Sequence, residues 1–100
     1  MEKQTQHYDL TVVKARVTRD GIFTFTATAR KGASALGLSE AVAVGMVLNL
    51  QRSQLFKSMT THADHRVWQD IYHAFCPDGK AAYIKLTLQD GALVIPFKEK

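Results

Sequence analysis

The sequence has few of the residues that cross-link small proteins or hold them in membranes. Among its 100 residues are one cysteine, Cys76, and two prolines. A single cysteine excludes an intrachain disulfide and a zinc knuckle built on paired cysteines. The longest apolar run, residues 41–48, is interrupted by Gly45 and is too short to span a membrane. The first residues lack the apolar region of a secretion signal. We therefore expect a cytoplasmic protein.

No segment concentrates charge of one sign. The formal net charge is +4, and the excess of basic residues is shared equally by the two halves of the chain. A basic balance favours a polyanionic partner such as RNA, DNA or an acidic protein. Hydrophobic residues make up 46% and charged residues 22%, which is ordinary for a folded globular protein. At this length we expect one domain over residues 1–100.

The first half of the chain predicts mainly helices. Asp9 is a suitable N-cap for a helix with Leu10, Val13 and Val17 on one face, ended by the Asp20-Gly21 turn. Residues 22–28 alternate aromatic or small residues with threonines, which predicts a strand. A short helix is expected over residues 30–36, closed by Gly37. A longer helix then runs from the N-cap Ser39 to about residue 50. Its expected buried stripe is Val42, Met46 and Leu50.

The second half predicts an antiparallel sheet. Residues 55–61, 67–72 and 82–88 have strand character, and a further strand over residues 93–98 is an edge strand or is bulged because Pro96 cannot donate a ladder hydrogen bond. The expected connections are a loop at residues 62–65, a turn at Pro77-Asp78-Gly79 and a tight hairpin at Asp90-Gly91. Helices followed by an antiparallel meander predict an α+β domain with its helices packed on one face of the sheet.

Alternation along these strands separates a core face from an open face. Ile84, Leu86, Leu88, Leu93, Ile95 and Phe97 are expected to face the helices. Tyr83, Lys85 and Lys98 then lie on the opposite face. The site that we predict there consists of Lys57, Gln69, Tyr83 and Lys98. Lysines can balance the charge of a phosphorane, and a lysine whose pKa is lowered by a cationic neighbour can act as a base. Tyrosine can donate a proton, and glutamine can hold an amide edge or a phosphate oxygen.

Each of these features also has a purely structural interpretation. Lysines and a tyrosine on strands are commonly a solvated face. His62 and His65 have the spacing of two metal ligands, but a third ligand is lacking, so a solvated loop or the rim of an RNA site fits as well. Arg30-Lys31-Gly32 is either a charged helix start or a phosphate-facing helix N-terminus. Trp68 is either a core residue or a platform for base stacking.

Four segments together resemble a known family. They are Lys57-Ser58-Met59-Thr60-Thr61, Asp64-His65, Trp68-Gln69-Asp70-Ile71-Tyr72 and the terminal Phe97-Lys98-Glu99-Lys100. This combination resembles the motility quorum-sensing regulator toxins, the MqsR family. The similarity is strong from about residue 55 onward and looser before it. Two departures are Phe56, where a relative has tyrosine, and Asp90-Gly91, where a histidine-aspartate pair stands.

The resemblance implies a RelE-like α+β fold and a type II toxin that cuts single-stranded mRNA, favouring GCU sites, without a metal or other cofactor. It further implies a cognate antitoxin with a zinc-bearing N-terminal domain and a DNA-binding C-terminal domain, through which alone operator DNA is reached and the operon is regulated. No membrane is implied. The site residues carried over are Lys57, Gln69, Tyr83 and Lys98, with Phe56, Met59, Lys85 and His65 as expected substrate contacts. The alternative is a catalytically weakened RNA-binding or protein-interaction module.

Overall fold

The computed structural model describes residues 1–89 and 91–100, so the predicted Asp90-Gly91 hairpin lies partly outside the described residues. Helices dominate the first half and strands the second. In chain order the elements are β1 (Glu2–Lys3), α1 (Leu10–Asp20), the 3₁₀ helix η1 (Gly21–Thr24), α2 (Ala27–Ala35), α3 (Glu40–Leu48), the 3₁₀ helix η2 (Arg52–Gln54), β2 (Leu55–Thr60), β3 (Trp68–Phe75), β4 (Ala81–Gln89), β5 (Ala92–Val94) and β6 (Phe97–Glu99).

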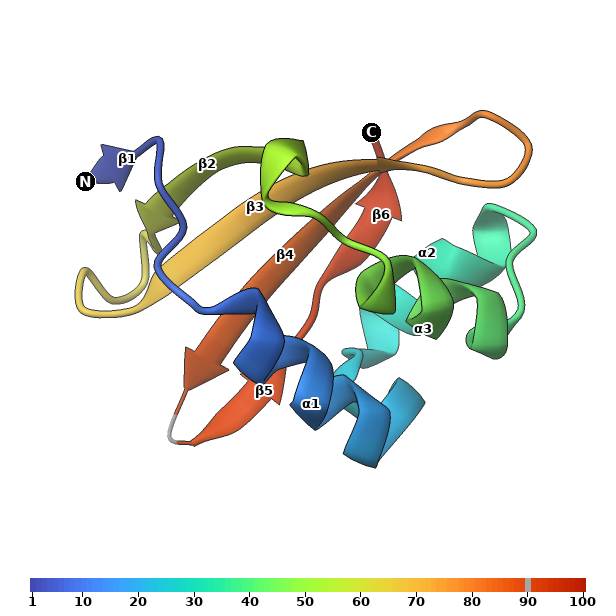
Figure 1. Ribbon diagram of the computed structural model, residues 1–100, viewed down its shortest axis with the longest axis horizontal. Helices are drawn as coiled ribbons and strands as arrows, with labels where there is room; N and C mark the ends of the chain where they lie inside the picture. The colour runs from blue at the N-terminus through green and yellow to red at the C-terminus, as the bar shows by residue number, and fades with distance from the viewer. Residues whose placement is uncertain (90) are drawn as a thin grey trace.

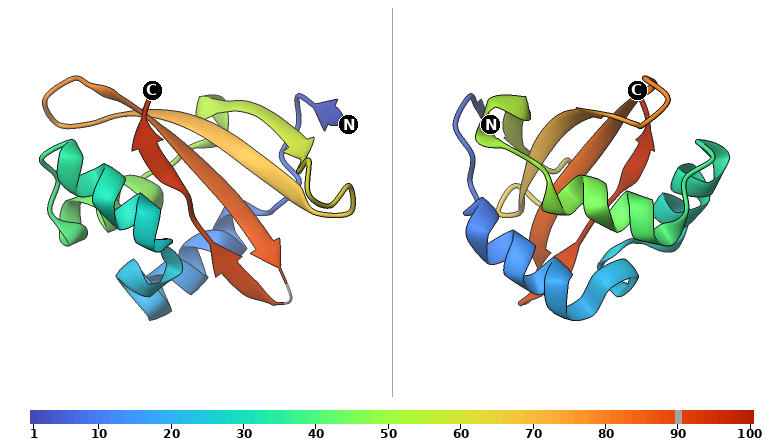
Figure 2. Two further views of the ribbon diagram at one scale, coloured as in Figure 1. Left: turned by 180° about the vertical axis from the view of Figure 1, so that it is seen from behind. Right: turned by 45° about the vertical axis from the view of Figure 1, so that its right-hand side comes forward.

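The strands form one antiparallel sheet. Its order is β1-β2-β3-β4-β5, and β6 also pairs with β4 beyond the end of β5. The three α-helices gather on the same side of this sheet (Figures 1 and 2). The predicted α+β class, with an antiparallel sheet and helices on one face, is therefore confirmed. Among the described residues, no single helix is long and apolar enough to cross a membrane; α2 and α3 reach such a length and composition only together, bent by 103°.

The core lies between the helices and the inner face of the sheet. The residues expected from the alternation of β4 to β6 are buried there, with Leu88 only partly enclosed. Leu10, Val13 and Val17 of α1 are buried as predicted, and the Asp9 carboxylate accepts a hydrogen bond from the Thr11 N–H at 2.8 Å. Side chains return to the same face every two residues in a strand and every 3.6 residues in a helix. The buried face of each element can therefore be identified without knowing which element packs against it.

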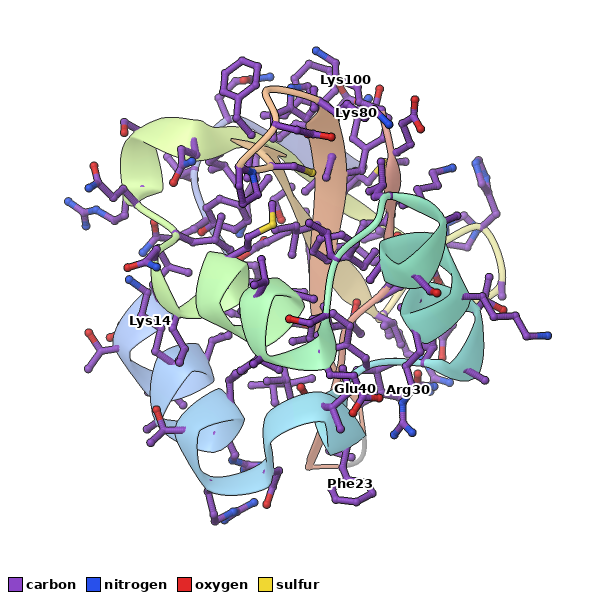
Figure 3. All side chains as sticks on the ribbon, turned by 90° about the vertical axis from the view of Figure 1, so that its right-hand side faces the viewer. Lys14, Phe23, Arg30, Glu40, Lys80 and Lys100 are labelled. Carbon is purple, nitrogen blue, oxygen red and sulfur yellow. The ribbon has the colours of Figure 1, made fainter. Side chains whose placement is uncertain are left out.

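The strand predicted over residues 22–28 is wrong. η1 occupies its first half, Phe25 makes only an isolated bridge with Ile95, and α2 begins at Ala27. The threonines explain this, because their hydroxyls bond to nearby backbone groups. The Thr24 hydroxyl donates to the Gly21 carbonyl at 2.7 Å, and the Thr26 hydroxyl caps α2 by accepting from the Ala29 N–H at 3.0 Å. Phe23 projects into solvent, with the Arg30 guanidinium 5.5 Å from its ring (Figure 3).

Two details of α2 and α3 also differ from expectation. α2 starts three residues earlier than predicted, so Arg30-Lys31-Gly32 lies inside the helix and offers no helix N-terminus to a phosphate. α3 begins at its predicted cap, Ser39, but buries Ala43 and Val47 instead of Val42 and Met46. Leu50 is buried beyond the helix end. Because α3 is apolar around most of its circumference, hydrophobic spacing alone did not identify its buried face.

Pro96 interrupts the last strand, where an edge strand or a bulge was predicted. The chain pairs with β4 as β5, breaks at Ile95-Pro96 and pairs again as β6. The Pro96 carbonyl still accepts a hydrogen bond from the Lys85 N–H at 3.0 Å. On the helix side, α2 packs so closely on β6 that a Cβ added to Gly32 would lie 2.5 Å from the Phe97 carbonyl oxygen. Close approach of two backbones requires glycine at this position.

Asp70 ties the N-terminal segment to the sheet, a role that sequence reasoning did not predict. Its carboxylate is fully buried and accepts hydrogen bonds from the N–H groups of His7 and Tyr8 at 2.8–2.9 Å. The segment runs alongside the sheet edge, where β1 pairs with β2. The His7 ring stacks on Trp68 with centroids 5.0 Å apart, so Trp68 is half-buried under this segment and is not an open platform for bases.

The buried phenol of Tyr72 makes the stability of the fold dependent on pH, which can be tested. Its side chain is fully buried, its hydroxyl has no hydrogen-bond partner among the described residues, and burial raises its pKa from 10.0 to about 12. Between these two values the unfolded chain binds fewer protons than the folded one, so the free energy of unfolding falls as pH rises. We expect Tyr72→Phe to be stabilising or neutral within about 1 kcal/mol at pH 7. It should gain a further ~1–3 kcal/mol over the parent protein by pH 12.

Chemical denaturation at several pH values measures this difference. Tyr8→Phe is the matched control, because the Tyr8 hydroxyl donates to the Trp68 carbonyl at 2.8 Å. Its loss should cost about 1 kcal/mol at pH 7. Equal stability of Tyr72→Phe and the parent protein at every pH would show that the Tyr72 phenol ionises freely in the folded state.

Candidate active site

The uncovered face of the sheet is organised in three rows by the strand register. Residues paired across antiparallel strands point to the same face. One row runs through His73, Tyr83 and Lys98, a second through Lys57, Ile71 and Lys85, and a third through Met59, Gln69, Thr87 and Val94. The four residues predicted as catalytic therefore lie on one face: Tyr83 and Lys98 share the first row, Lys57 lies in the second and Gln69 in the third. Their roles stay a prediction.

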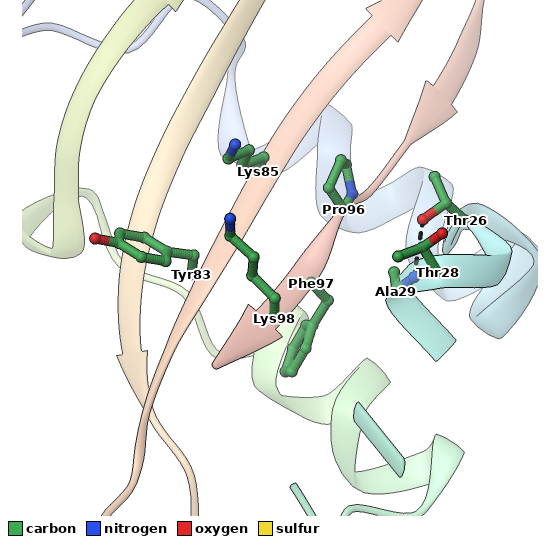
Figure 4. Close-up of a pocket in the computed structure, with 8 residues that line it drawn as sticks. All are labelled: Thr26, Thr28, Ala29, Tyr83, Lys85, Pro96, Phe97 and Lys98. Carbon is green, nitrogen blue, oxygen red and sulfur yellow. Dashed lines mark hydrogen bonds between the residues drawn. The ribbon is translucent and has the colours of Figure 1, made fainter. Parts of the chain in front are cut away.

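Tyr83, Lys85 and Lys98 are brought together most closely. They line two adjoining hollows, one of about 170 Å³ that extends to the start of α2 and one of about 230 Å³ that is also lined by Phe56. The ammonium groups of Lys85 and Lys98 lie near each other (Figure 4), and the Lys98 Nζ is 5.9 Å from the centre of the Tyr83 ring. Two cations and one phenol hydroxyl thus share a small open site.

Lys85 differs from an ordinary surface lysine in its electrostatic surroundings. Burial lowers the pKa of the Lys85 ammonium, and the positive charge of Lys98 lowers that pKa further. Lys85 is half-buried, whereas Lys98 is exposed. An anion placed between the two side chains would be attracted by both charges. A lysine with a lowered pKa is also a larger fraction neutral amine near pH 7, so it can accept a proton.

His73 completes the aromatic side of this site, and sequence reasoning missed it. Its ring stacks on Phe56 at a centroid distance of 4.5 Å and meets the Tyr83 ring edge at 4.8 Å. Burial lowers the pKa of His73, with a smaller contribution from the charge of Lys100. Its Nε2 atom is enclosed without a partner among the described residues. Alternation from Gln69 through Ile71 would have put His73 on this face, but the predicted strand ended at Tyr72.

Lys57 borders the site from β2. Its Nζ lies 5.3 Å from the centre of the Phe56 ring and 3.4 Å from a carboxylate oxygen of Glu2, in an exposed ion pair. Such pairs contribute at most about 1 kcal/mol, so an RNA phosphate can compete with Glu2 for this ammonium. A register shift in β2 between Leu55 and Lys57 places Phe56 against His73.

The structure keeps three predicted residues away from this group. Gln69 lies next to the Asp70–Leu86 pair, on the level of Thr87. Thr87 is four residues from Tyr83 along β4, a separation of about 13 Å. Gln69 also lines a separate hollow. Met59 and His65 line a third hollow beside β1. His62 belongs to the same hollow, and within the described ranges no three His, Cys, Asp or Glu side chains are arranged to hold a metal ion.

Comparisons with known proteins identify the family of this chain. Residues 5–99 match the model of a family described as "Motility quorum-sensing regulator, toxin of MqsA". The chain is also 38% identical over 100 residues to the mRNA interferase toxin MqsR of Escherichia coli (strain K12), with both chains covered completely. The family match spans nearly the whole chain, including β2 to β6. The chain therefore belongs to the motility quorum-sensing regulator toxin family.

Proposed function

We propose that this protein is the endoribonuclease toxin of a type II toxin–antitoxin system and cuts single-stranded mRNA without using a metal ion. Family membership and the name of its Escherichia coli relative support the toxin and mRNA interferase assignments. The observation that carries the chemistry is the pair Lys85 and Lys98 beside Tyr83 on the open face.

The proposed reaction is attack by a ribose 2′-oxygen on the neighbouring phosphorus. A neutral amine accepts the 2′-hydroxyl proton, and we assign this role to Lys85, whose pKa is lowered by burial and by the charge of Lys98. Lys98 and Lys57 balance the negative charge that develops on the phosphorane oxygens. As the bond from phosphorus to the 5′-oxygen breaks, the Tyr83 hydroxyl donates a proton to the leaving oxygen. The products are a 2′,3′-cyclic phosphate and a 5′-hydroxyl, and Gln69 orients the substrate.

The finer assignments follow from the family resemblance. We propose GCU-type cleavage sites and a cytoplasmic location. We also propose inhibition by a cognate antitoxin with a zinc-bearing N-terminal domain and a DNA-binding C-terminal domain. Operator DNA would be reached only through that antitoxin, in regulation of the shared operon. The family description, toxin of MqsA, supports an antitoxin partner. Phe56 and the Lys85–Lys98 pair supply a stacking surface and positive charge for single-stranded RNA.

Cleavage in the presence of a chelator tests the proposal. Purified protein is incubated with a single-stranded RNA containing one GCU site in excess EDTA, and the fragment ends are analysed by mass spectrometry. We expect one major cut with cyclic phosphate and 5′-hydroxyl ends. The same RNA with a 2′-deoxy nucleotide at the cut position should remain intact. Binding without cleavage would instead support the catalytically weakened module.

A further inference from the structure

The hollow around Gln69 differs in character from the lysine site. It measures about 210 Å³ and lies between the end of β4 and the loop that joins β2 to β3. Pro96 lines both this hollow and the one at Lys85 and Lys98, so the two adjoin across a single residue. A volume below the ~300–1,000 Å³ of pockets for drug-sized ligands suits a small planar group.

The polar groups in this hollow are neutral, with one exception. Gln69 and Gln89 contribute amides, and Thr87 contributes a hydroxyl. Asp64 is the only charged residue among those described that line it. Arg66 donates hydrogen bonds to the Asp64 carboxylate at 2.9–3.2 Å and lowers its pKa, so this group stays negative at neutral pH. Because the Asp64 charge is paired with Arg66 and none of the described residues that line the hollow is a cation, the hollow offers no net positive charge to a phosphate and suits an uncharged ligand.

Thr87 brings an unpartnered hydroxyl to the lining of this hollow. Its side chain is only 4% exposed, and its Oγ1 atom is buried without a hydrogen-bond partner in the described part of the chain. A buried hydroxyl without a partner costs about 1–3 kcal/mol, so such groups call for an explanation. A group with both donors and acceptors on its edge would satisfy Thr87 and the neighbouring Gln69 amide together.

We propose that this hollow binds one nucleobase of the RNA substrate, with Gln69 and Thr87 hydrogen-bonding to its edge. The inference rests on the proposed function and assigns these residues to sequence preference. Thr87 lies two residues from Lys85 on the same face, about 7 Å away. The bound base therefore belongs to a nucleotide next to the cleaved phosphate. Unstacked bases of single-stranded RNA are recognised in this way, through hydrogen bonds to their exposed edges.

Binding to an uncleavable RNA pool tests the assignment independently of catalysis. The full-length protein is equilibrated with randomised 2′-fluoro RNA, which lacks the attacking hydroxyl, and the bound RNA is sequenced. We expect the parent protein to enrich one base at one position of its motif. Gln69→Leu and Thr87→Val should each reduce that enrichment about tenfold or more while leaving the other positions unchanged. Thr18→Val, on the exposed face of α1, is the matched control and should retain the full preference.

The outcomes separate this inference from the proposed function. Thr87→Val removes an unpartnered hydroxyl, so its thermal stability should equal or exceed that of the parent protein, which excludes misfolding as a cause. Absence of any base preference in the parent protein, or full preference in both variants, would overturn the base pocket. A preference lost in the variants, together with no cleavage of ordinary RNA by the parent protein, would uphold the pocket and overturn the nuclease.

Discussion

Lys98→Met should lower the single-turnover rate of RNA cleavage about 10²–10³-fold, because in the proposed mechanism it removes one of the positive charges that balance the phosphorane. Methionine keeps much of the length and apolar stem of lysine, so the sheet should remain intact. The side chain is exposed and makes no ion pair among the residues described, and the stability of the fold therefore does not depend on it.

The same variant should also move the pH dependence of the reaction. The charge of Lys98 contributes to the lowered pKa of Lys85, and its removal lets that pKa rise toward the ordinary value of 10.5. If neutral Lys85 accepts the 2′-hydroxyl proton, the rate increases with pH until Lys85 is fully deprotonated. This rising limb should therefore lie at higher pH in Lys98→Met than in the parent protein.

Lys80→Met is the control for a simple loss of net charge. Lys80 follows the turn before β4, is exposed and lies 3.9 Å from the Asp78 carboxylate. We expect its rate to stay within about threefold of the parent rate and its pH profile to be unchanged, since long-range charge effects are screened at moderate salt. A large rate loss in Lys98→Met with an unmoved pH profile would show that Lys85 is not the base.

Gly32→Ala should destabilise the protein by about 3 kcal/mol and lower the melting temperature by more than about 10 °C. The new Cβ would lie 2.5 Å from the Phe97 carbonyl oxygen, which is a backbone atom. Neither partner can relieve the contact by rotating a side chain, so α2 must move away from β6. That movement also widens the hollow between the start of α2 and Lys98, which should weaken RNA binding.

Gly45→Ala is the matched control in α3. No atom lies within 4 Å of a Cβ added there, and its φ is not positive. The substitution should raise the free energy of unfolding by about 0.5–1 kcal/mol, because alanine loses less backbone entropy than glycine in a helix. Denaturant unfolding of both variants measures the contrast. Equal effects at the two glycines would contradict the close packing of α2 on β6.

Strand alternation predicted the side of the sheet on which the proposed site residues lie, and Tyr83, Lys85 and Lys98 were identified in this way. It could not predict how far along the sheet each residue lies, because that depends on strand register. Gln69 was therefore grouped with Tyr83, although it lines a separate hollow. The register shift in β2 that brings Phe56 to His73 likewise depends on how β2 pairs with β3, and alternation within β2 does not predict it.

Other differences arose where local hydrogen bonds overrode a repeating pattern. Threonines at positions 24 and 26 have the spacing of a strand, yet their hydroxyls bond to the backbone and favour a turn and a helix cap. The buried Asp70 looks like an ordinary surface aspartate in the sequence. Its partners are backbone N–H groups more than 60 residues earlier, which no local pattern indicates.

β4 carries Tyr83, Lys85 and Thr87 on one face at alternate positions, inside a strand that pairs along most of its length. The distance between the groups proposed to cut RNA and those proposed to bind a base is thus set by the hydrogen-bonded backbone of one strand in the middle of the sheet. Because both sets of groups share this strand, warming is expected to change their spacing only when the strand itself comes apart. Fidelity and turnover should disappear together, in the one cooperative transition that melts the domain.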